Sequence, residues 1–279
     1  MHIIERRKIF YIISLILIIP GLISLFTQGL NLGIDFQGGS ITQVNIGGKV
    51  TVAEVRATVA DLGLERAEIT RSGNEFFIRT PELNQEETKE LLGALEKKFV
   101  KVEFLSAESV GATIGKELTN KAILATIIAA LAMLIYISLR FEWTFGVAAI
   151  VSEIHDILFV LGLFSLLQWE INTPFIAAIL TIVGYSINDT IVIFDRIREN
   201  LRNKRKEDYA TLVNRSVTQT FNRSINTVLT CVFALTALLI FGGGTLKLFV
   251  GAMLIGFVVG AYSSICVASP IWYELKNRA

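Results

Sequence analysis

The sequence predicts an α-helical membrane protein with six transmembrane helices and one small α+β domain between the first and second. The 279 residues are 52% hydrophobic and only 18% charged, whereas soluble domains carry about a quarter charged residues. The apolar residues form blocks of about 20 residues, the length that crosses a bilayer core as a helix. The charges lie between these blocks, and many fall in one ordinary stretch after the first block.

The hydrophobic blocks divide the chain into three parts. Residues 1–29 hold the N-terminus and the first span, residues 30–118 the inserted domain, and residues 119–279 a five-helix bundle. Basic residues precede the first block as in a signal peptide, but its end (LFTQ) lacks the small residues of a cleavage site, so we expect a retained anchor. The spans are expected at residues 9–26, 122–139, 144–167, 174–194, 224–241 and 248–270.

The distribution of Lys and Arg predicts the orientation, because cytoplasmic loops are enriched in these residues. Only Lys247 lies in the two short loops on the opposite side. We therefore expect a multi-pass protein of the cell (inner) membrane with both termini in the cytoplasm and the inserted domain outside. The basic, partly amphipathic segment 196–222 is expected to lie on the anionic cytoplasmic leaflet. The orienting charges are Arg6, Arg7, Lys8, Arg140, Arg196, Arg198, Arg202, Lys204, Arg205, Lys206, Arg215, Arg223, Lys276 and Arg278.

The inserted domain has the pattern of a β-α-β-β-α-β unit. Strands are expected at residues 40–46, 67–71, 75–80 and 101–106, and helices at residues 51–62 and 84–99. Thr51 and Glu54 have capping-box spacing at the start of the first helix. The order of elements indicates a ferredoxin-like split βαβ fold. The domain holds neither histidine of the chain and no nucleophile–base pair, so we expect a binding or mechanical role, with a purely stabilising role left open.

A glycine-rich linker precedes this domain. Gly33, Gly38 and Gly39 flank Asp35 and Phe36. Glycines permit tight turns and close approach of backbones, but the spacing alone does not define a function.

Polar side chains within the spans are the strongest functional candidates, because ionisable groups in a membrane are costly and typically functional. Since lipid cannot satisfy them, they should face the interior of the bundle. Span 3 carries Glu153, His155 and Asp156, span 4 carries Tyr185, Asn188 and Asp189 followed by Asp195 and Arg196, and span 5 begins with Arg223 and Asn226.

Two interpretations of Asp189 and Arg223 remain open. They could form a buried structural ion pair that fixes the registration of two helices. Alternatively, Asp189 takes up and releases a proton, since burial favours the neutral acid and a nearby Arg favours the carboxylate. His155 and Asp156 could likewise be interior hydrogen-bonding groups or part of a proton route. Glu153 lies three residues from Asp156, where two carboxylates would repel, so we expect one to be protonated or to face a water-filled gap.

The other features of the spans predict packing. Ala252, Gly256, Gly260 and Ser264 form a small-residue stripe in span 6, which suits close helix contacts inside the protein or with a partner. The two cysteines lie in apolar blocks and are expected to be free. We expect no metal, no cofactor, no nucleic-acid partner and no enzymatic activity.

Several motifs together resemble the SecD/SecF family of protein-export membrane proteins. Residues 33–39 (GIDFQGG) resemble its G-x-D-F-x-G-G signature, and His155-Asp156 matches its third-span HD. Residues 184–190 (GYSINDT) with 194–200 (FDRIREN) resemble its fourth-span motif, and residues 223–227 (RSINT) the start of its fifth span. The resemblance covers essentially the whole chain. Glu153 stands where the family usually has an apolar or small residue.

The resemblance implies a function. Within this family, the chain resembles the SecF-type subunit. That subunit acts with SecD and resembles half of a resistance-nodulation-division exporter. It implies help in late preprotein translocation and release on the outward face, driven by the proton-motive force, with Asp189 and Arg223 as the essential proton-linked pair. The implied partners are SecD, the SecYEG channel with SecA, YajC, preproteins, protons and membrane lipid. The alternative is a proton-driven exporter subunit for lipids or small hydrophobic molecules.

Overall fold

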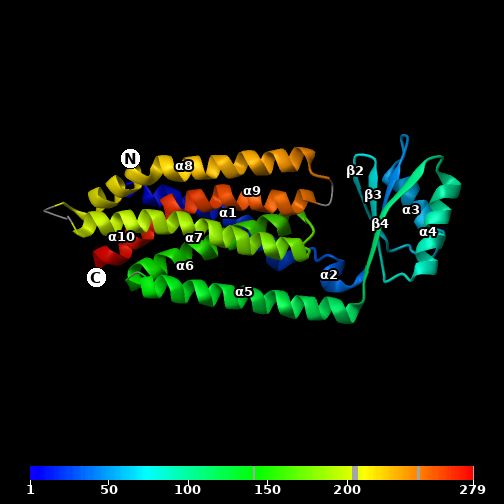
Figure 1. Cartoon of the computed structure of the whole chain (residues 1–279), viewed down its shortest axis with the longest axis horizontal. Helices are drawn as coiled ribbons and strands as arrows, with labels where there is room; N and C mark the ends of the chain where they lie inside the picture. The colour runs from blue at the N-terminus through cyan, green and yellow to red at the C-terminus, as the bar shows by residue number, and fades with distance from the viewer. Residues whose placement is uncertain (141, 203–206, 244–245, 279) are drawn as a thin grey trace. The chain divides into compact units, whose positions relative to one another are not determined.

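The computed structural model describes residues 1–140, 142–202, 207–243 and 246–278 (Figure 1). The chain forms two compact units: a bundle unit of Met1–Asn31 with Leu124–Ala279, and an inserted unit, Leu32–Ile123. The expected orienting charges Lys204, Arg205 and Lys206 lie outside the described residues. The bundle is therefore discontinuous in sequence, because its first helix precedes the inserted unit.

The inserted unit contains one four-stranded sheet with the strand order β2-β3-β1-β4. Each neighbouring pair of strands is antiparallel. Two helices interrupt the strands in sequence, and a short helix precedes them. The elements are α2 (Ile34–Gln37), β1 (Gly39–Ile46), α3 (Val52–Ala60), β2 (Glu68–Ser72), β3 (Glu75–Thr80), α4 (Gln85–Lys98) and β4 (Val102–Val110).

The core of this unit follows from the alternation of its strands and the periodicity of its helices. Val44, Phe76 and Ile78 point to one face of the sheet and are fully buried, as are Val55 of α3 and Leu91 of α4. Residues two apart in a strand share a face, which places the apolar side chains of β1 and β3 against the helices. The helix expected at residues 51–62 ends earlier, at Ala60, so that Leu62 lies beyond α3 and is 38% exposed.

Both helices of the inserted unit begin with capping boxes. Thr51 and Glu54 form the one that their spacing predicts. Asn84 accepts from the backbone N–H groups of Glu86 and Glu87, and the Glu87 side chain accepts from the Asn84 N–H. These contacts satisfy N–H groups that have no partner within the helix.

Six long helices in the described part of the chain are apolar enough to cross a membrane, as the sequence predicts. The last crossing combines α9, a π-helical segment η2 and α10. The elements are α1 (Arg7–Thr27), α5 (Ala112–Arg140), α6 (Trp143–Leu167), α7 (Thr173–Arg202), α8 (Tyr209–Phe241), α9 (Lys247–Ser263), η2 (Ser264–Ala268) and α10 (Ser269–Arg278).

Three of these helices extend beyond the predicted apolar blocks. α5 begins ten residues earlier than the block, at Ala112, and α7 continues to Arg202. α8 begins at Tyr209, so much of the separate segment expected at residues 196–222 belongs to the polar ends of α7 and α8. The difference arises because hydropathy marks only the apolar part of a helix, whereas backbone hydrogen bonding continues past it.

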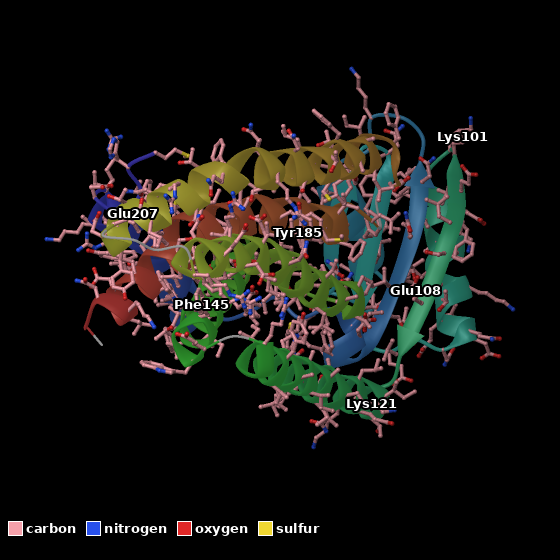
Figure 2. The ribbon with its side chains drawn as sticks, turned by 60° about the vertical axis from the view of Figure 1, so that its left-hand side comes forward. Lys101, Glu108, Lys121, Phe145, Tyr185 and Glu207 are labelled. Carbon is pink, nitrogen blue, oxygen red and sulfur yellow. The ribbon has the colours of Figure 1, made fainter. Side chains whose placement is uncertain are left out.

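The bundle core is aromatic where α6, α7 and α10 meet. Phe145 stacks on Trp272 with ring centroids 4.9 Å apart and meets Phe194 edge-on at 5.0 Å. All three side chains are almost fully buried, and Figure 2 labels Phe145 on α6. Such aromatic pairs add to the stabilisation that burial alone provides.

Glycines allow the closest helix contacts of the bundle. A Cβ atom at Gly21 of α1 would lie 2.6 Å from the Cα of Gly162 of α6. On α9, a Cβ at Gly256 would clash with Ile182 of α7, and one at Gly260 would lie 2.9 Å from the Cβ of Ser186. The small-residue stripe therefore packs inside the protein against α7, one of the two possibilities left open by the sequence.

Candidate functional site

The buried polar groups of the bundle meet around Asp156 of α6. Its side chain is completely buried. Its Oδ2 atom accepts hydrogen bonds from Ser186 Oγ of α7 and Ser263 Oγ of α9, each 2.7 Å long. Asp156 thus joins three helices through two hydroxyl donors, and hydrogen bonds to a charged or acidic partner in a dry interior are strong.

His155 connects this group to α1. Its Nδ1 atom lies 2.9 Å from Asp156 Oδ1, and its Nε2 atom lies 3.0 Å from Ser14 Oγ. Ser14 in turn lies 3.2 Å from the hydroxyl of Tyr262, which donates to the carbonyl of Phe10. The HD pair of the sequence is therefore the centre of a hydrogen-bonded chain between α1, α6 and α9.

Asp189 of α7 forms a second buried acid site. Ser224 Oγ of α8 donates to its Oδ1 atom over 2.6 Å. Its Oδ2 atom is buried without a hydrogen-bond partner among the described residues. Asp189 thus keeps one free acceptor atom, unlike Asp156.

Arg223 is not paired with Asp189. Its side chain is exposed, and no ion pair joins it to Asp189 within the described residues. The structure therefore contains no direct ion pair between Asp189 and Arg223 within the described residues, and the two interpretations of these residues stay predictions. The neighbouring Ser224 supplies the contact instead, because it lies on the face of α8 that packs against α7.

Arg223 instead lines a cavity of about 340 Å³ between α7 and α8. The Arg196 side chain donates a hydrogen bond to Gln219 of α8 and also forms an ion pair with Glu199. Asp195, predicted as part of the same motif, is bonded to Arg198 at 2.8 Å. The predicted Asn226 is exposed on α8. Arg196 thus links α7 to α8, whereas Asp195 pairs with Arg198 within α7.

Glu153 is the least satisfied acid in the described bundle. It is 7% exposed, and neither carboxyl oxygen has a hydrogen-bond partner among the residues placed by the structure. It lies one turn before Asp156 on α6. A buried carboxylate without a partner is very costly, so the expectation that one of these two carboxyl groups is protonated stays a prediction.

The other predicted residues of span 4 divide between the interior and the surface. The ring of Tyr185 stacks on Phe257 of α9 with centroids 4.0 Å apart, and its hydroxyl is buried without a described partner. Figure 2 labels Tyr185 on α7. Asn188 is exposed and does not join the buried acids.

Hydroxyl groups complete the site, and the sequence interpretation missed several of them. Ser263 binds Asp156, while the adjacent Ser264 lies 2.8 Å from Thr190 Oγ1 of α7. Ser14 and Tyr262 extend the network from His155. Serine in an apolar helix is a weak functional signal because its hydroxyl can bond to a carbonyl group of its own helix. The signal that could have found Ser263 is its position next to Ser264, the last residue of the small-residue stripe.

The glycine-rich linker belongs to the inserted unit and is a packing feature there. Gly38 and Gly39 have φ angles of +79° and +131°, which disfavour other residues. A Cβ at Gly38 would lie 2.8 Å from the Cα of Ala112. The predicted Gly33 precedes α2, whose first turn holds Asp35 and Phe36. These residues let the linker fold tightly against the start of α5.

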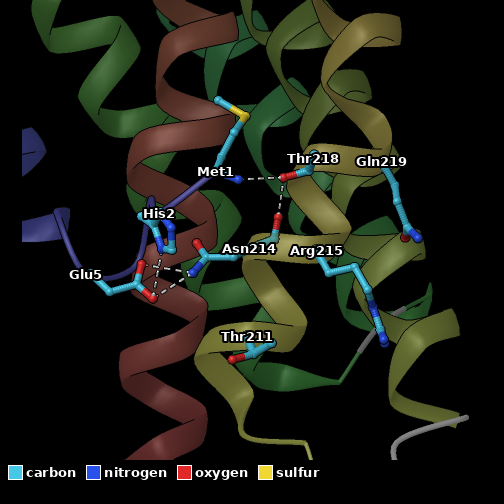
Figure 3. A pocket seen from close by; sticks show the side chains of 8 residues that line it. All are labelled: Met1, His2, Glu5, Thr211, Asn214, Arg215, Thr218 and Gln219. Carbon is cyan, nitrogen blue, oxygen red and sulfur yellow. Dashed lines mark hydrogen bonds and ion pairs between the residues drawn. The ribbon is translucent and has the colours of Figure 1, made fainter.

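A surface pocket of about 320 Å³ lies where the first residues of the chain pack on α8 (Figure 3). Asn214 accepts from the backbone N–H groups of Ile3 and Ile4 and donates to Glu5. His2 lies 3.8 Å from Glu5. These contacts attach the N-terminal segment to α8. Within the described residues, no group of three His, Cys, Asp or Glu side chains could hold a metal ion.

These features define a class of protein: a multi-pass membrane protein whose helix bundle holds buried carboxyl groups. The family described as "Protein export membrane protein SecD/SecF, C-terminal" matches residues 91–278, and the "SecD/SecF GG Motif" matches residues 23–46. The chain belongs to the SecD/SecF family.

Relatives and solved structures agree with this assignment. "Protein translocase subunit SecF" of Sebaldella termitidis is 41% identical over 98% of this chain and 91% of its own length. "Protein translocase subunit SecDF" of Bacillus subtilis is 40% identical over 98% of this chain but only 38% of its own length. The crystal structure of SecDF from Thermus thermophilus, a translocon-associated membrane protein, matches with a TM-score of 0.94 and 39% identity. The match covers all of this chain and 39% of the SecDF chain in that crystal structure.

Proposed function

We propose that the chain is an accessory subunit of the Sec protein-export translocase. The names of relatives that match over nearly their full length support this role. Export of a polypeptide needs no chemical conversion of the substrate, and the proposal includes none.

The protein would couple proton movement to late preprotein translocation and release through Asp189. The observation that carries this step is the half-satisfied carboxyl group: Ser224 holds one oxygen at 2.6 Å, and the other is buried with no partner among the described residues. Such a group can change protonation state with little rearrangement of its own contacts. Because Ser224 lies on α8, a change of charge at Asp189 would alter the contact between two spans. An elementary charge crossing the membrane potential supplies about 2.3 kcal/mol per 100 mV, enough to bias two helix arrangements.

Arg223 would act near Asp189 rather than as its fixed partner. It follows Phe221 and Asn222 on the same helix and immediately precedes Ser224, and it lines the cavity between α7 and α8. From there it could attract the carboxylate when Asp189 loses its proton. His155, Asp156, Glu153 and Tyr185 would form the interior part of the proton route.

The inserted unit is proposed to have the ferredoxin-like split βαβ fold and to contact the preprotein. The strand order β2-β3-β1-β4 and the order of helices and strands along the chain support that fold. We assign the chain the architecture of half a resistance-nodulation-division exporter, and the six spans with one inserted unit are compatible with that assignment. The proposed domain limits remain 1–29, 30–118 and 119–279.

SecD is the proposed main partner. Two relatives named SecDF contain a region similar to this chain within a longer chain. A separate SecD subunit would take the place of the remaining part of those longer chains. Membrane lipid or SecD would cover the exposed apolar side chains of α5, among them Ile127, Ile128 and Leu131. The SecYEG channel with SecA, and YajC, are further proposed partners. Both termini would be cytoplasmic and the inserted unit outside.

The test is preprotein release into the lumen of inverted membrane vesicles that carry SecD and this chain. Asp189→Asn should abolish the acceleration of release by a proton gradient, while translocation driven by ATP alone continues. Glu65→Gln removes an exposed carboxyl group that lies outside the bundle and should release preprotein as the unmodified chain does. Unchanged proton-dependent release in Asp189→Asn would refute the coupling step.

A further inference from the structure

The hydrogen-bonded chain at His155 ends on an atom that can only accept. The Tyr262 hydroxyl lies 2.9 Å from the Phe10 carbonyl oxygen and donates to it. A tyrosine hydroxyl has one hydrogen, so Tyr262 has none left for its second neighbour, Ser14. The bond between these two hydroxyls, 3.2 Å long, therefore has Ser14 as its donor.

The same counting fixes the next bond. The single hydrogen of the Ser14 hydroxyl is used on Tyr262, so Ser14 must accept from its other neighbour, Nε2 of His155, at 3.0 Å. His155 therefore carries a hydrogen on Nε2. Its other nitrogen, Nδ1, faces Asp156 Oδ1 at 2.9 Å, and a hydrogen bond of this length needs one hydrogen between the two atoms.

We infer that His155 and Asp156 together hold one proton more than a neutral histidine and a carboxylate would. The pair is either an imidazolium with a carboxylate or a neutral imidazole with a carboxylic acid, and in both forms its net charge is zero. Ser14 and Tyr262 are positioning residues, since they fix the Nε2–H form of the ring. This proton site is separate from Asp189, and the inference does not rest on the proposed coupling to export.

The burial of Asp156 supports the inference independently. The side chain is fully buried, and no described Lys or Arg pairs with it. An unpaired carboxylate in a dry interior is strongly disfavoured, whereas a pair of zero net charge avoids that cost. The nearby ionisable groups offer no compensating positive charge: Glu153 precedes on α6, Asp189 lies one turn beyond Ser186 on α7, and Tyr262 comes from α9. The group that α1 places against His155 is the uncharged hydroxyl of Ser14.

The competing arrangement has a distinct proton count. If Ser14 donated to Nε2 instead, the ring would carry its hydrogen on Nδ1 and donate to a bare carboxylate. The oxygens of Ser14 and Tyr262 would then face each other at 3.2 Å with no hydrogen between them, and Asp156 would be a buried net charge. The two arrangements place the ring hydrogen on opposite nitrogens, which can be measured.

Nitrogen-15 labelling of histidine separates the two arrangements. The chain has two histidines, so His2→Gln leaves His155 as the only signal in the full chain in lipid nanodiscs. We expect Nε2 to be protonated at neutral pH, with Nδ1 either protonated or accepting a hydrogen bond. A His155 ring protonated on Nδ1 alone would overturn the inference.

If Nδ1 is unprotonated, the proton of the pair must lie on Asp156, and infrared spectroscopy can detect it there. In that case the difference spectrum between the unmodified chain and Asp156→Asn should contain the carbonyl band of a protonated carboxyl group, and the absence of that band would also overturn the inference. Tyr262→Phe frees the Ser14 hydrogen for Nε2, so the ring should switch to the Nδ1–H form. Tyr136→Phe removes an exposed hydroxyl of α5 that lies outside this chain of bonds and should leave the His155 signals unchanged.

Discussion

At the scale of single residues, the three buried acids of the bundle differ in how well their oxygens are satisfied. Asp156 has partners on both oxygens, Asp189 on one and Glu153 on neither, among the residues that the structure describes. An acid with complete partners has a fixed environment, whereas a free acceptor atom allows a change of protonation without breaking bonds. The proton exchange proposed for Asp189 depends on its one free oxygen atom.

The contact between Ser224 and Asp189 should contribute measurably to stability. Ser224→Ala removes the single hydrogen bond that the structure gives the Asp189 carboxyl group, and a buried group left without its partner costs about 1–3 kcal/mol. We expect a lower Tm in thermal unfolding of the purified protein in detergent. Thr230→Ala is the control, because its exposed hydroxyl bonds to Thr227 within its own helix. Equal Tm values for the two variants would contradict the assigned contact.

At the scale of helices and strands, the sequence predicted most where the signal is local. Apolar blocks located six helices, and Thr51 with Glu54 located the start of α3, because each pattern depends on residues close in sequence. The partners of the buried acids could not be predicted in this way. Ser14 and Ser263 reach His155 and Asp156 from helices far away in sequence, and their placement depends on how the helices pack. The exposed position of Arg223 likewise depends on the rotation of α8 against α7.

The contact of α1 with α6 should tolerate no side chain at Gly162. A Cβ there would lie 2.9 Å from the Cα of Gly21, and the backbone cannot move aside without separating two helices. Gly162→Ala should therefore destabilise the protein by about 1–3 kcal/mol, as overpacking of a core does, with a lower Tm in detergent. Gly251→Ala is the matched control, since nothing lies within 4 Å of its Cβ position, and its Tm should equal or exceed that of the unmodified protein.

The first helix of the inserted unit should depend on pH through its capping box. The backbone N–H of Thr51 donates to Glu54, and with the Thr51 hydroxyl it lowers the pKa of that carboxyl group below its ordinary value of 4.5. A lowered pKa in the folded state means that the carboxylate stabilises α3 above the ordinary value, and that this contribution disappears as the pH falls through the lowered pKa.

Hydrogen exchange of the α3 amides in the full chain provides the measurement. Glu54→Gln should speed exchange at neutral pH and remove most of the dependence of α3 protection on pH between about 6 and 3, once intrinsic exchange rates are corrected for. Glu65→Gln changes an exposed carboxyl group just beyond α3. It should leave unchanged both the exchange rate of the α3 amides at neutral pH and the pH dependence of their protection. If Glu54→Gln kept the full pH dependence, the capping box would not be its source.

At the scale of the whole molecule, the arrangement of charges predicts which side of the membrane each unit faces. In a variant with both cysteines replaced by alanine, Lys49→Cys in the inserted unit should react with a membrane-impermeant maleimide added outside intact spheroplasts. Asn277→Cys near the end of α10 should react only after the membrane is permeabilised. Both positions are exposed, so access to solvent within the protein is not limiting. Labelling of Asn277→Cys in intact spheroplasts would show that the C-terminus is outside and would contradict the predicted orientation.

The π-helical segment η2 has a consequence for the whole last span. Its five residues lie between the glycines that pack on α7 and Trp272, which stacks on Phe145. A π-helical turn closes its hydrogen bond over five residues instead of four, so it holds one residue more than an α-helical turn. A single-residue deletion within 264–268 would therefore return the segment to α-helical geometry and leave Trp272 close to Phe145, whereas the same deletion in a regular α-helix would rotate everything after it by about 100°. The wide turn thus lets the last span absorb a change of one residue while both of its packed surfaces keep their neighbours.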